Sequence, residues 1–293
     1  MKHTPPLDIL ILPAVSNMEE ITKKFPFKIT LTKGYYRHIE FIFQGEDFSI
    51  LYKGKNLRNF SFVWLSSSWH SRDLAYAIKL YLEKYEIPHT FVEKGTSKVT
   101  DHTLFALHNL PVPHTLFLDY KDIKPHLDRI RDICDYPVVI KDIKGSKGSK
   151  SVLAQSEDEL LSALETLPKN KKYLFQQYIP NDYDWGVLVA NGEVVSGEKS
   201  YPQEGEFRNN TCNGAREVFI EKAMIPKNIQ DIAIQAGKSL GLSWSRSDII
   251  IDKNTQNPYL MEVNRLPGLT SKTSEVEGAY TFLSQQIQNS FHK

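Results

Sequence analysis

Three oxygen-bearing side chains near the end of the chain have a spacing that suits metal binding. Asp248 begins an apolar run, and Glu262 and Asn264 stand two residues apart in the next such run. Both runs have the composition of β-strands, and residues two apart on a strand point to the same face. We therefore expect the three side chains to converge. Carboxylate and amide oxygens suit hard cations such as Mg²⁺, which is often held together with nucleotide phosphates, so the first hypothesis is an enzyme that uses ATP.

A loop rich in glycine, serine and lysine, at 141–151, is the second candidate. It joins two β-type runs, and Gly145, Ser146 and Gly148 would let backbone N–H groups approach a polyphosphate closely. Its spacing is not that of a P-loop. Lys141 ends the apolar run before the loop, where its ammonium could meet a phosphate oxygen. A solvated hairpin would have the same composition, so both interpretations stay open.

The segment around residues 177–184 could bind the rest of a nucleotide. Gln177 and the backbone of Tyr178 and Ile179 could contact the edge of an adenine ring. Asp184 follows a few residues later and could accept hydrogen bonds from ribose hydroxyls. The alternative for Asp184 is an aspartate that caps its own turn.

Two arginines could stabilise negative charge that develops during a reaction. Arg246 precedes Asp248 by two residues and is expected on the same strand face. A buried arginine there needs an anion, although a structural salt bridge to Asp248 or Glu262 is an alternative. Arg208 lies with Asn210 in a long polar loop.

Composition narrows the class of protein. The chain has 293 residues, of which 41% are hydrophobic, and a net charge of +1, which gives no support for a general nucleic-acid binder. The two cysteines, Cys134 and Cys212, are far apart and lack metal-ligand spacing, as do the histidines. We find no signal-peptide pattern, no apolar run of membrane-spanning length and no Rossmann glycine fingerprint. We expect a soluble, cytoplasmic protein.

Hydrophobic patterns predict an N-terminal α/β unit over residues 1–95. Its helix is expected from Leu74 to Tyr85, where apolar residues repeat at helical spacing. Strands are expected at 7–12, 27–31, 39–43, 48–52, 62–65 and 89–92.

Two further units, 96–172 and 173–293, are expected to follow. Helices are expected at 101–108, 121–133 and 227–240, after Ser156, and from Thr281 to the end of the chain. Strands are expected at 136–141, 151–154, 173–179, 185–190 and 193–198, besides the two that carry the acidic residues. Asn191-Gly192 predicts a hairpin turn between two of these strands.

Taken together, the motifs resemble the ATP-grasp superfamily of carboxylate–amine ligases over about Lys98 to Ser274. Lys98 ahead of 104–113, the stretch 176–179, and Phe207-Arg208-Asn209-Asn210 followed by Gly214 are similar to RimK-type amino-acid ligases. Trp244-Ser245-Arg246-Ser247-Asp248 and the stretch 262–274 are more similar to D-alanine–D-alanine ligase.

The resemblance implies an α/β (α+β) architecture: an N-terminal α/β domain, then an ATP-grasp fold of two α+β subdomains that grip ATP. By position, it implies that Lys98 and Lys141 contact ATP, that the glycine loop covers the phosphates, and that Asp184 holds the ribose. It further implies that Asp248, Glu262 and Asn264 bind Mg²⁺, with Mn²⁺ as an alternative. Roles also follow for Arg246 and Arg208 in catalysis, for Asn210 and Ser274 in substrate binding, and, more loosely, for Lys199 in nucleotide binding.

Two positions depart from the pattern of the superfamily. Lys150 stands where the phosphate loop usually carries another glycine, and Gln177 stands where an acid is common. These two residues therefore weaken the resemblance in two respects: closure of the phosphate loop and recognition of adenine.

The function that the resemblance implies is amide-bond formation through an acyl phosphate. The expected partners are ATP and small-molecule or peptide carboxylate and amine substrates, with no nucleic acid and no membrane; a homodimer is left open. A phosphotransferase on the same scaffold and a non-catalytic nucleotide-binding protein are the alternatives.

Overall fold

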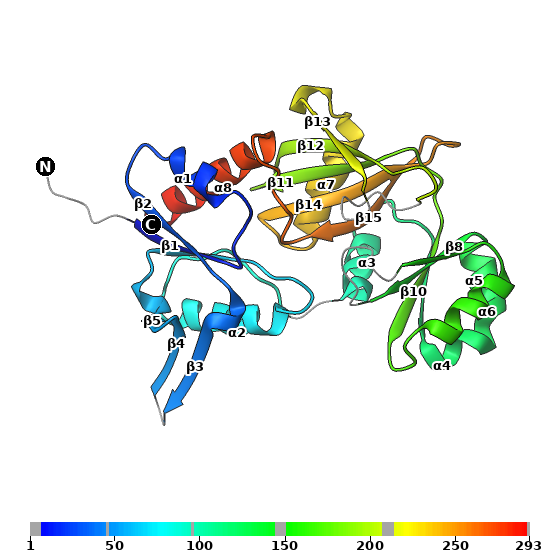
Figure 1. Cartoon of the computed structure of the whole chain (residues 1–293), viewed down its shortest axis with the longest axis horizontal. Helices are drawn as coiled ribbons and strands as arrows, with labels where there is room; N and C mark the ends of the chain where they lie inside the picture. The colour runs from blue at the N-terminus through cyan, green and yellow to red at the C-terminus, as the bar shows by residue number, and fades with distance from the viewer. Residues whose placement is uncertain (1–6, 45–46, 95–96, 144–150, 207–213, 292–293) are drawn as a thin grey trace, which may run out of the picture.

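The structure is a computed structural model that describes residues 7–44, 47–94, 97–143, 151–206 and 214–291. The described chain forms two three-stranded sheets, one four-stranded sheet and one five-stranded sheet, with helices packed on their faces (Figure 1). Sheets covered by helices agree with the α/β (α+β) architecture expected from the sequence.

A small parallel sheet forms the centre of the N-terminal part. β1 (Leu7–Leu12) lies between β2 (Ile29–Lys33) and β6 (Phe62–Leu65). The helices of this part are α1 (Met18–Lys23) and α2 (Arg72–Lys84). A separate antiparallel sheet and two short 3-10 helices complete it: β3 (Ile39–Gln44), β4 (Asp47–Tyr52), β5 (Lys55–Asn56), η1 (Tyr36–His38) and η2 (Leu57–Asn59).

The strand expected at 89–92 is wrong. His89 forms only an isolated bridge with Val63. The reason is visible one residue later, where the hydroxyl of Thr90 accepts a hydrogen bond from the backbone N–H of Leu65 at 2.7 Å. A side chain therefore takes the position that a backbone carbonyl would hold in a continued ladder.

The four-stranded sheet is antiparallel, in the order β7 (Thr115–Asp119), β10 (Lys172–Gln177), β8 (Val138–Asp142) and β9 (Val152–Ala154). The expected boundary between residues 172 and 173 falls inside β10, which pairs with β7 and β8. We retain the three-unit division as a proposal, and this pairing favours a last boundary after Gln177. β7 had no counterpart among the expected strands.

Helices cover one face of the four-stranded sheet. They are α4 (Tyr120–Ile123), η3 (Lys124–His126), α5 (Leu127–Cys134) and α6 (Glu157–Thr166), while α3 (Lys98–Leu107) precedes the sheet and packs elsewhere. The single helix expected at 121–133 is interrupted because Pro125 lies within η3. Val138, Ile140 and Phe175 face the helices and are fully buried. Strand alternation therefore turns Lys141 and Gln176 to the opposite face.

The five-stranded sheet is also antiparallel, in the order β13 (Arg216–Ile220), β12 (Glu193–Tyr201), β11 (Asp184–Ala190), β14 (Trp244–Ile251) and β15 (Pro258–Asn264). The short helix η5 (Lys222–Met224) follows β13, and α7 (Lys227–Ser239) packs on the face that carries Trp185, Val187 and Val189. The predicted hairpin turn at Asn191-Gly192 is confirmed, with φ of 49° and 82° at the two residues.

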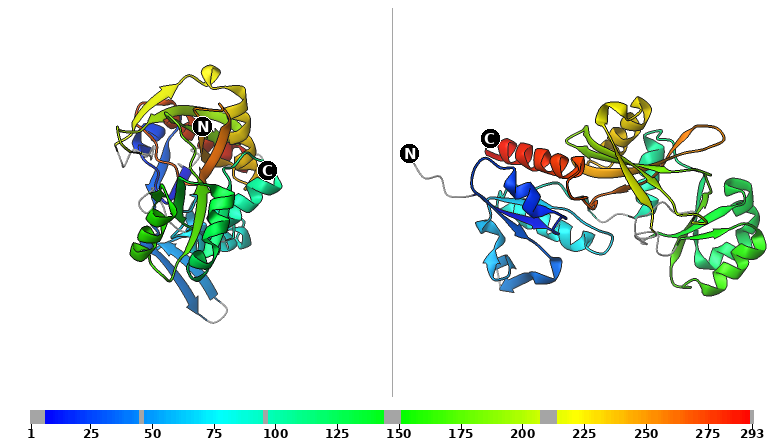
Figure 2. Two further views of the ribbon diagram at one scale, coloured as in Figure 1. Left: turned by 90° about the vertical axis from the view of Figure 1, so that its right-hand side faces the viewer. Right: turned by 45° about the horizontal axis from the view of Figure 1, so that its top comes forward.

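The last helix joins the two ends of the chain. α8 (Ser274–Phe291) begins seven residues before the expected Thr281 and packs on β11, β12 and α1. Figure 2 shows it lying between the N-terminal sheet and the five-stranded sheet. One hydrophobic cluster accordingly combines Ile9 and Trp64 with Trp244, Phe282 and Leu283. None of the described helices has both the length and the apolar composition needed to cross a bilayer.

Candidate active site

The three predicted metal ligands lie on one face of the five-stranded sheet. Asp248 pairs directly with Glu262, and Arg246 pairs with Asn264, so the four side chains share a face. The Asn264 amide Nδ2 donates a hydrogen bond to Asp248 Oδ2 at 2.9 Å. The predicted convergence of Asp248, Glu262 and Asn264 is therefore present in the backbone register, and Asp248 and Asn264 are in direct contact.

A lysine from α3 meets this group. Lys98 Nζ lies 2.5 Å from Glu262 Oε2, and the Lys98 side chain is 12% exposed. The ammonium holds the pKa of Glu262 below its usual value, whereas burial raises the pKa of Asp248. The pKa values of the two carboxylates are therefore shifted in opposite directions. Glu262 is the one kept charged, by a contact from another part of the chain.

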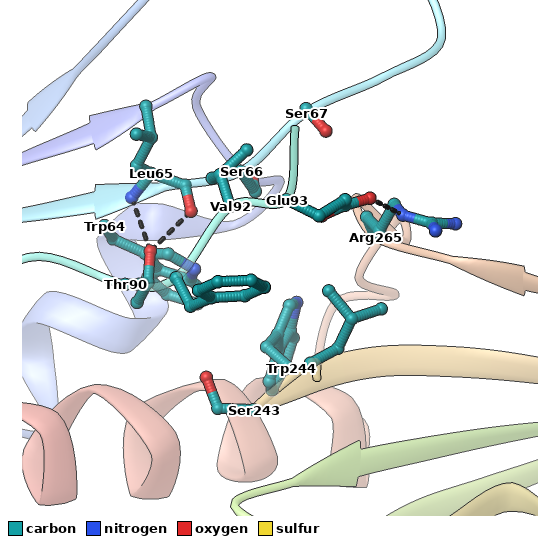
Figure 3. Close-up of a pocket in the computed structure, with 12 residues that line it drawn as sticks. Trp64, Leu65, Ser66, Ser67, Thr90, Val92, Glu93, Ser243, Trp244 and Arg265 are labelled. Carbon is teal, nitrogen blue, oxygen red and sulfur yellow. Dashed lines mark hydrogen bonds and ion pairs between the residues drawn. The ribbon is translucent and has the colours of Figure 1, made fainter. Parts of the chain in front are cut away.

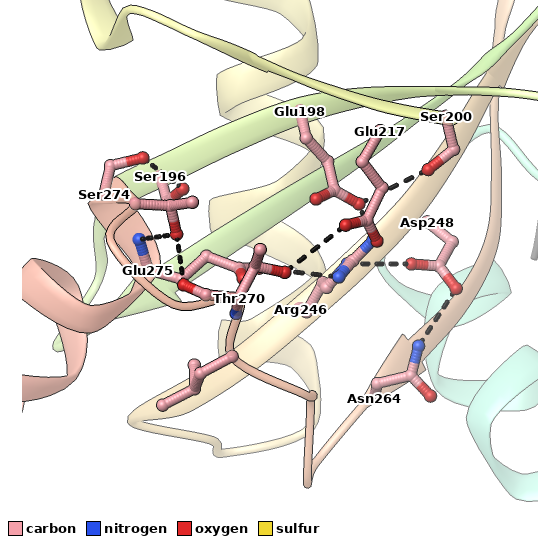
Figure 4. A network of polar contacts seen from close by, with 12 residues as sticks. Ser196, Glu198, Ser200, Glu217, Arg246, Asp248, Asn264, Thr270, Ser274 and Glu275 are labelled. Carbon is pink, nitrogen blue, oxygen red and sulfur yellow. Dashed lines mark hydrogen bonds and ion pairs between the residues drawn. The ribbon is translucent and has the colours of Figure 1, made fainter. Parts of the chain in front are cut away.

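Arg246 is held by three carboxylates. Its guanidinium makes an ion pair with Glu198 and lies 3.5 Å from Glu275 and 3.7 Å from Asp248 (Figure 4). Glu198 and Glu275 are almost completely buried, so Arg246 is fixed in place by charges that have no access to water. The ion pair with Asp248 that the sequence left open is present, and it does not exclude a contact with a ligand.

Gly186 makes room for this arginine. It lies opposite Asp248 on β11, and a Cβ atom added there would come within 2.5 Å of Arg246 Nη2. A glycine inside an apolar strand signals close approach of another group, and that signal was available in the sequence. Gly186 was nevertheless missed as a site residue.

Ser274 begins α8 and is tied to the sheet. Its hydroxyl lies 2.7 Å from the hydroxyl of Ser196, on the same side of the sheet as Arg246 (Figure 4). Glu275 accepts a hydrogen bond from the backbone N–H of Thr270 at 2.7 Å, which closes the loop before the helix. The predicted substrate residue Ser274 therefore lies within the same polar network as Arg246.

Lys141 faces this site from the four-stranded sheet. Its Nζ donates a hydrogen bond to the buried Gln176 Oε1 at 2.6 Å. Burial, helped by the charge of Lys98, lowers the pKa of Lys141 to about 8, while the charges of Glu262 and Asp248 act in the opposite direction. Gln176 was missed by the sequence reasoning because an amide on a strand carries no signal of its own.

The donor set fits a hard divalent cation. Two carboxylates and one amide provide only oxygen ligands on one face, as Mg²⁺ and Mn²⁺ prefer. Within the described ranges, no group of three or more histidine, cysteine, aspartate or glutamate side chains is placed to bind a metal. A cation held by Asp248, Glu262 and Asn264 would therefore depend on ligand or water oxygens to complete its coordination.

The predicted adenine and ribose contacts lie at the junction between the two larger sheets. Gln177 accepts a hydrogen bond from the backbone of His114 at 3.4 Å, and the Tyr178 N–H donates to the carbonyl of Pro137 at 3.2 Å. These groups already have partners in the protein, and Ile179 is buried. Asp184 begins β11 on the face that carries Asp248. All four assignments stay predictions.

Other predicted residues are not brought into this group. Lys199 pairs with Trp185 on β11, which turns it to the face opposite Asp248, and its Nζ lies 4.1 Å from the centre of the Tyr183 ring. Five predicted residues lie outside the residues that the structure describes: Gly145, Ser146, Gly148, Arg208 and Asn210.

A small pocket separates the end of β6 from the five-stranded sheet. Figure 3 shows Ser67, Glu93 and Arg265 at one side of it and Trp64 and Trp244 at the other. Arg265, which directly follows the predicted ligand Asn264, is buried and was missed by the sequence reasoning. Its signal was a charged residue at the end of a buried strand, where a partner is required.

Comparison with known proteins places this geometry in context. A family model described as a RimK-like ATP-grasp domain matches residues 95–285. A probable alpha-L-glutamate ligase from Aeromonas salmonicida is 30% identical over 181 residues, which cover 61% of this chain and 58% of that protein. The chain thus matches less than two thirds of the length of this relative.

Solved structures are similar over almost the whole chain. The D-alanine–D-alanine ligase from Bacillus anthracis complexed with ATP has a TM-score of 0.68 at 18% identity and covers 98% of each chain. The ATP-grasp ligase PsnB, complexed with a minimal precursor, Mg and ADP, has a TM-score of 0.64 at 16% identity and covers 97% of this chain and 99% of that one. At these identities, the similarity establishes the fold.

Proposed function

The chain belongs to the RimK-like ATP-grasp family, and on that premise we propose that it is an ATP-dependent ligase that joins a carboxylate to an amine. The observation that carries the proposal is the oxygen set of Asp248, Glu262 and Asn264 beside the ammonium groups of Lys98 and Lys141. The name of the Aeromonas relative, a probable alpha-L-glutamate ligase, supports amino-acid or peptide substrates. Mg²⁺ or Mn²⁺ on the oxygen set would neutralise phosphate charge.

The proposed reaction has two steps. A substrate carboxylate attacks the γ-phosphorus of ATP and releases ADP, which leaves an acyl phosphate. An amine then attacks the acyl carbon, phosphate leaves, and the amine loses a proton as the amide forms. Both steps concentrate negative charge on phosphoryl oxygens, and preorganised cations stabilise that charge.

The side chains of this protein have separate tasks in that scheme. Lys141, held by Gln176, and Lys98, which contacts Glu262, would both contact the phosphates. Arg246, fixed by Glu198 and Glu275, would lie beside the transferred phosphoryl group. Binding ATP would give Lys98 a phosphate partner in competition with Glu262, which would leave that carboxylate available as a ligand.

The experiment that tests the function is a phosphate-release screen with ATP, Mg²⁺ and pairs of amino acids and dipeptides. We expect phosphate release only when both an acid and an amine are present. A phosphorylated product without free phosphate would indicate a phosphotransferase instead. ATP binding without turnover across the whole screen would indicate a non-catalytic nucleotide-binding protein.

The Glu262→Gln substitution tests the metal assignment within that screen. We expect turnover to fall by roughly 100-fold or more, because one charged ligand is lost at the site of developing charge. Glu277→Gln is the matched control, since Glu277 is 62% exposed and pairs only with Lys24 among the described residues. Circular dichroism checks that both variants fold. Full activity of Glu262→Gln would remove the metal assignment.

A further inference from the structure

A buried arginine at the start of α2 has two guanidinium nitrogens without a hydrogen bond to any residue that the structure describes. Arg72 is 4% exposed, and its Nε and Nη1 atoms are buried without a hydrogen bond in the described part of the protein. Its guanidinium lies 3.6 Å from the centre of the Trp69 ring, which holds the plane of the group in position. A buried charged donor without a partner is costly to the fold, so it needs an explanation.

The neighbouring carboxylates are committed to another arginine. Asp101 accepts two hydrogen bonds from Arg265, at 2.8 and 2.9 Å. Glu93 also accepts from Arg265, and the nearest approach of Arg72 to Glu93 is 3.9 Å, beyond hydrogen-bond distance. Burial and the charge of Arg265 lower the pKa of Arg72 to about 10, so Arg72 remains protonated at neutral pH. Nearby carboxylates therefore balance the charge of Arg72, but its Nε–H and Nη1–H groups have no hydrogen-bond acceptor among the described residues.

Two further donor groups lie within five residues of Arg72 in the sequence. Ser67 is 2% exposed, its hydroxyl has no hydrogen-bond partner in the described residues, and it lines the pocket of Figure 3. The N-cap residue of α2, Ser71, accepts a hydrogen bond from the backbone N–H of Ser68 at 3.0 Å and does not cap the first turn of its own helix. The positive end of this 13-residue helix has no side-chain cap, and the acidic residue of its first turn, Asp73, is exposed.

The location of these donors relates them to the candidate active site. They follow β6, at the carboxyl end of a parallel strand, where α/β sheets commonly bind ligands. The Trp69 ring that carries Arg72 also lies 5.4 Å from Lys98 Nζ. Lys98 in turn contacts Glu262. One aromatic ring thus separates the unused donors from the proposed phosphate and metal groups.

We propose that Arg72, Ser67 and the first turn of α2 bind a carboxylate of the substrate other than the one that is activated. A guanidinium fork matches the two oxygens of a carboxylate, and the buried serine hydroxyl supplies a third donor. This inference rests on the proposed ligase function and deepens it. The acid or the amine substrate carries a second carboxylate, as a dicarboxylic amino acid or a peptide with a free terminus does.

The first test compares substrate analogues. Once the screen has identified a substrate pair, each free carboxylate is replaced by a carboxamide in turn. We expect one replacement to raise KM at least 10-fold in the wild type and less than 2-fold in Arg72→Met, with KM for ATP changed less than 2-fold in both. Equal effects in the wild type and the variant, or an equal rise in KM for ATP, would overturn the proposal.

A matched control and a charge-conserving variant keep this comparison interpretable. Arg58 also stacks on an aromatic ring, at 4.3 Å from the centre of Tyr85, but it is exposed, so Arg58→Met should leave every KM unchanged. Arg72→Lys keeps the charge without the fork, and we expect an intermediate KM. If Arg72→Met fails to fold, Arg72→Lys and Ser67→Ala serve in its place, and unchanged discrimination in both would overturn the proposal.

A binding experiment separates this inference from the proposed reaction. L-glutamate, glutamine, isoglutamine and inorganic phosphate are titrated against the wild-type protein by calorimetry in the presence of a non-hydrolysable ATP analogue. Tighter binding of glutamate than of either amide, lost in Arg72→Met, supports the subsite even if no turnover is found. Binding of phosphate alone that Arg72→Met abolishes would assign the donors to phosphate and overturn the carboxylate proposal.

Discussion

At the scale of single residues, the site depends on charges that hold one another in place. Arg246 is surrounded by Glu198, Glu275 and Asp248, so its position follows from buried carboxylates more than from its own flexible side chain. The arginine can lie flat across β11 only because residue 186 has no side chain. A residue without functional groups thus determines where a catalytic candidate points.

The Gly186→Ala substitution tests this dependence. The added methyl group would push Arg246 away from its present position, and we expect kcat to fall by roughly 10- to 100-fold, because misplacing a charge by about 1 Å costs that much. The measurement is phosphate release with a substrate pair from the screen.

The matched control is Gly268→Ala, since an added Cβ at Gly268 meets no atom within 4 Å. Thermal melting should show both variants folded. Wild-type activity in Gly186→Ala would contradict the positioning of Arg246 by this glycine.

At the scale of elements, α3 carries residues that act on two sheets. Its first residue, Lys98, reaches Glu262 on β15, and Asp101 binds Arg265 at the end of the same strand. His102 packs edge-on against Phe105 and lies near Lys98 and Lys141. The helix therefore brings an ammonium to the predicted metal ligand Glu262, while a buried ion pair fixes the orientation of the helix.

His102, on α3, makes the stability of the protein depend on pH. Burial, helped by the charges of Lys141 and Lys98, lowers the pKa of His102 to about 4, whereas the unfolded chain keeps its ordinary value near 6.5. The unfolded state binds more protons between these values, so stability is complete above pH 6.5 and is lost as pH falls toward 4. We expect a loss of at most about 3 kcal/mol through this group.

The measurement is the free energy of unfolding from denaturant titrations between pH 7 and pH 4. The wild type should lose more stability over this range than His102→Gln, with each protein referred to its own value at pH 7. His108→Gln, an exposed histidine at the end of the same helix, is the control and should follow the wild type. Parallel curves for the wild type and His102→Gln would refute the prediction.

At the scale of the whole molecule, the N-terminal part and the five-stranded sheet share one core. The ring of Trp64 on β6 lies 5.3 Å from that of Trp244 on β14 and 5.1 Å from that of Phe282 on α8. Segments from both ends of the sequence therefore bury the same aromatic group. The four-stranded sheet has its own core, built with α5 and α6.

The Trp64→Ala substitution tests this shared core. We expect the free energy of unfolding to fall by about 3–5 kcal/mol, because a large buried side chain is removed. The N-terminal part and the five-stranded sheet should still unfold in one transition, followed by denaturant titration with far-UV dichroism and tryptophan fluorescence. Phe43→Ala, at a side chain that is 74% exposed, should change stability by no more than about 0.5 kcal/mol. Two separate transitions would contradict a common core.

The sequence alone determined the features that depend on local spacing. Apolar runs predicted the strands with Asp248 and Glu262, and residues two apart on a strand share a face, so the grouping of Asp248, Glu262 and Asn264 was predicted before any contact was known. The hairpin at Asn191-Gly192 followed from turn chemistry in the same way. The resemblance to the family predicted the fold and pointed to Lys98 as a site residue, because short stretches around a site carry its chemistry.

Only the tertiary structure decided which distant groups meet. The contacts of Lys98 with Glu262 and of Arg265 with Asp101 each join residues 164 positions apart, and no local pattern encodes such a pair. The packing of whole elements decides on which side of the sheet Lys199 lies and why Arg246 needs a glycine at position 186. It also decides that two donors of Arg72 lack a partner among the described residues. Register and burial are collective properties of the folded chain, and they decide whether a charged side chain finds a partner or remains available to a ligand.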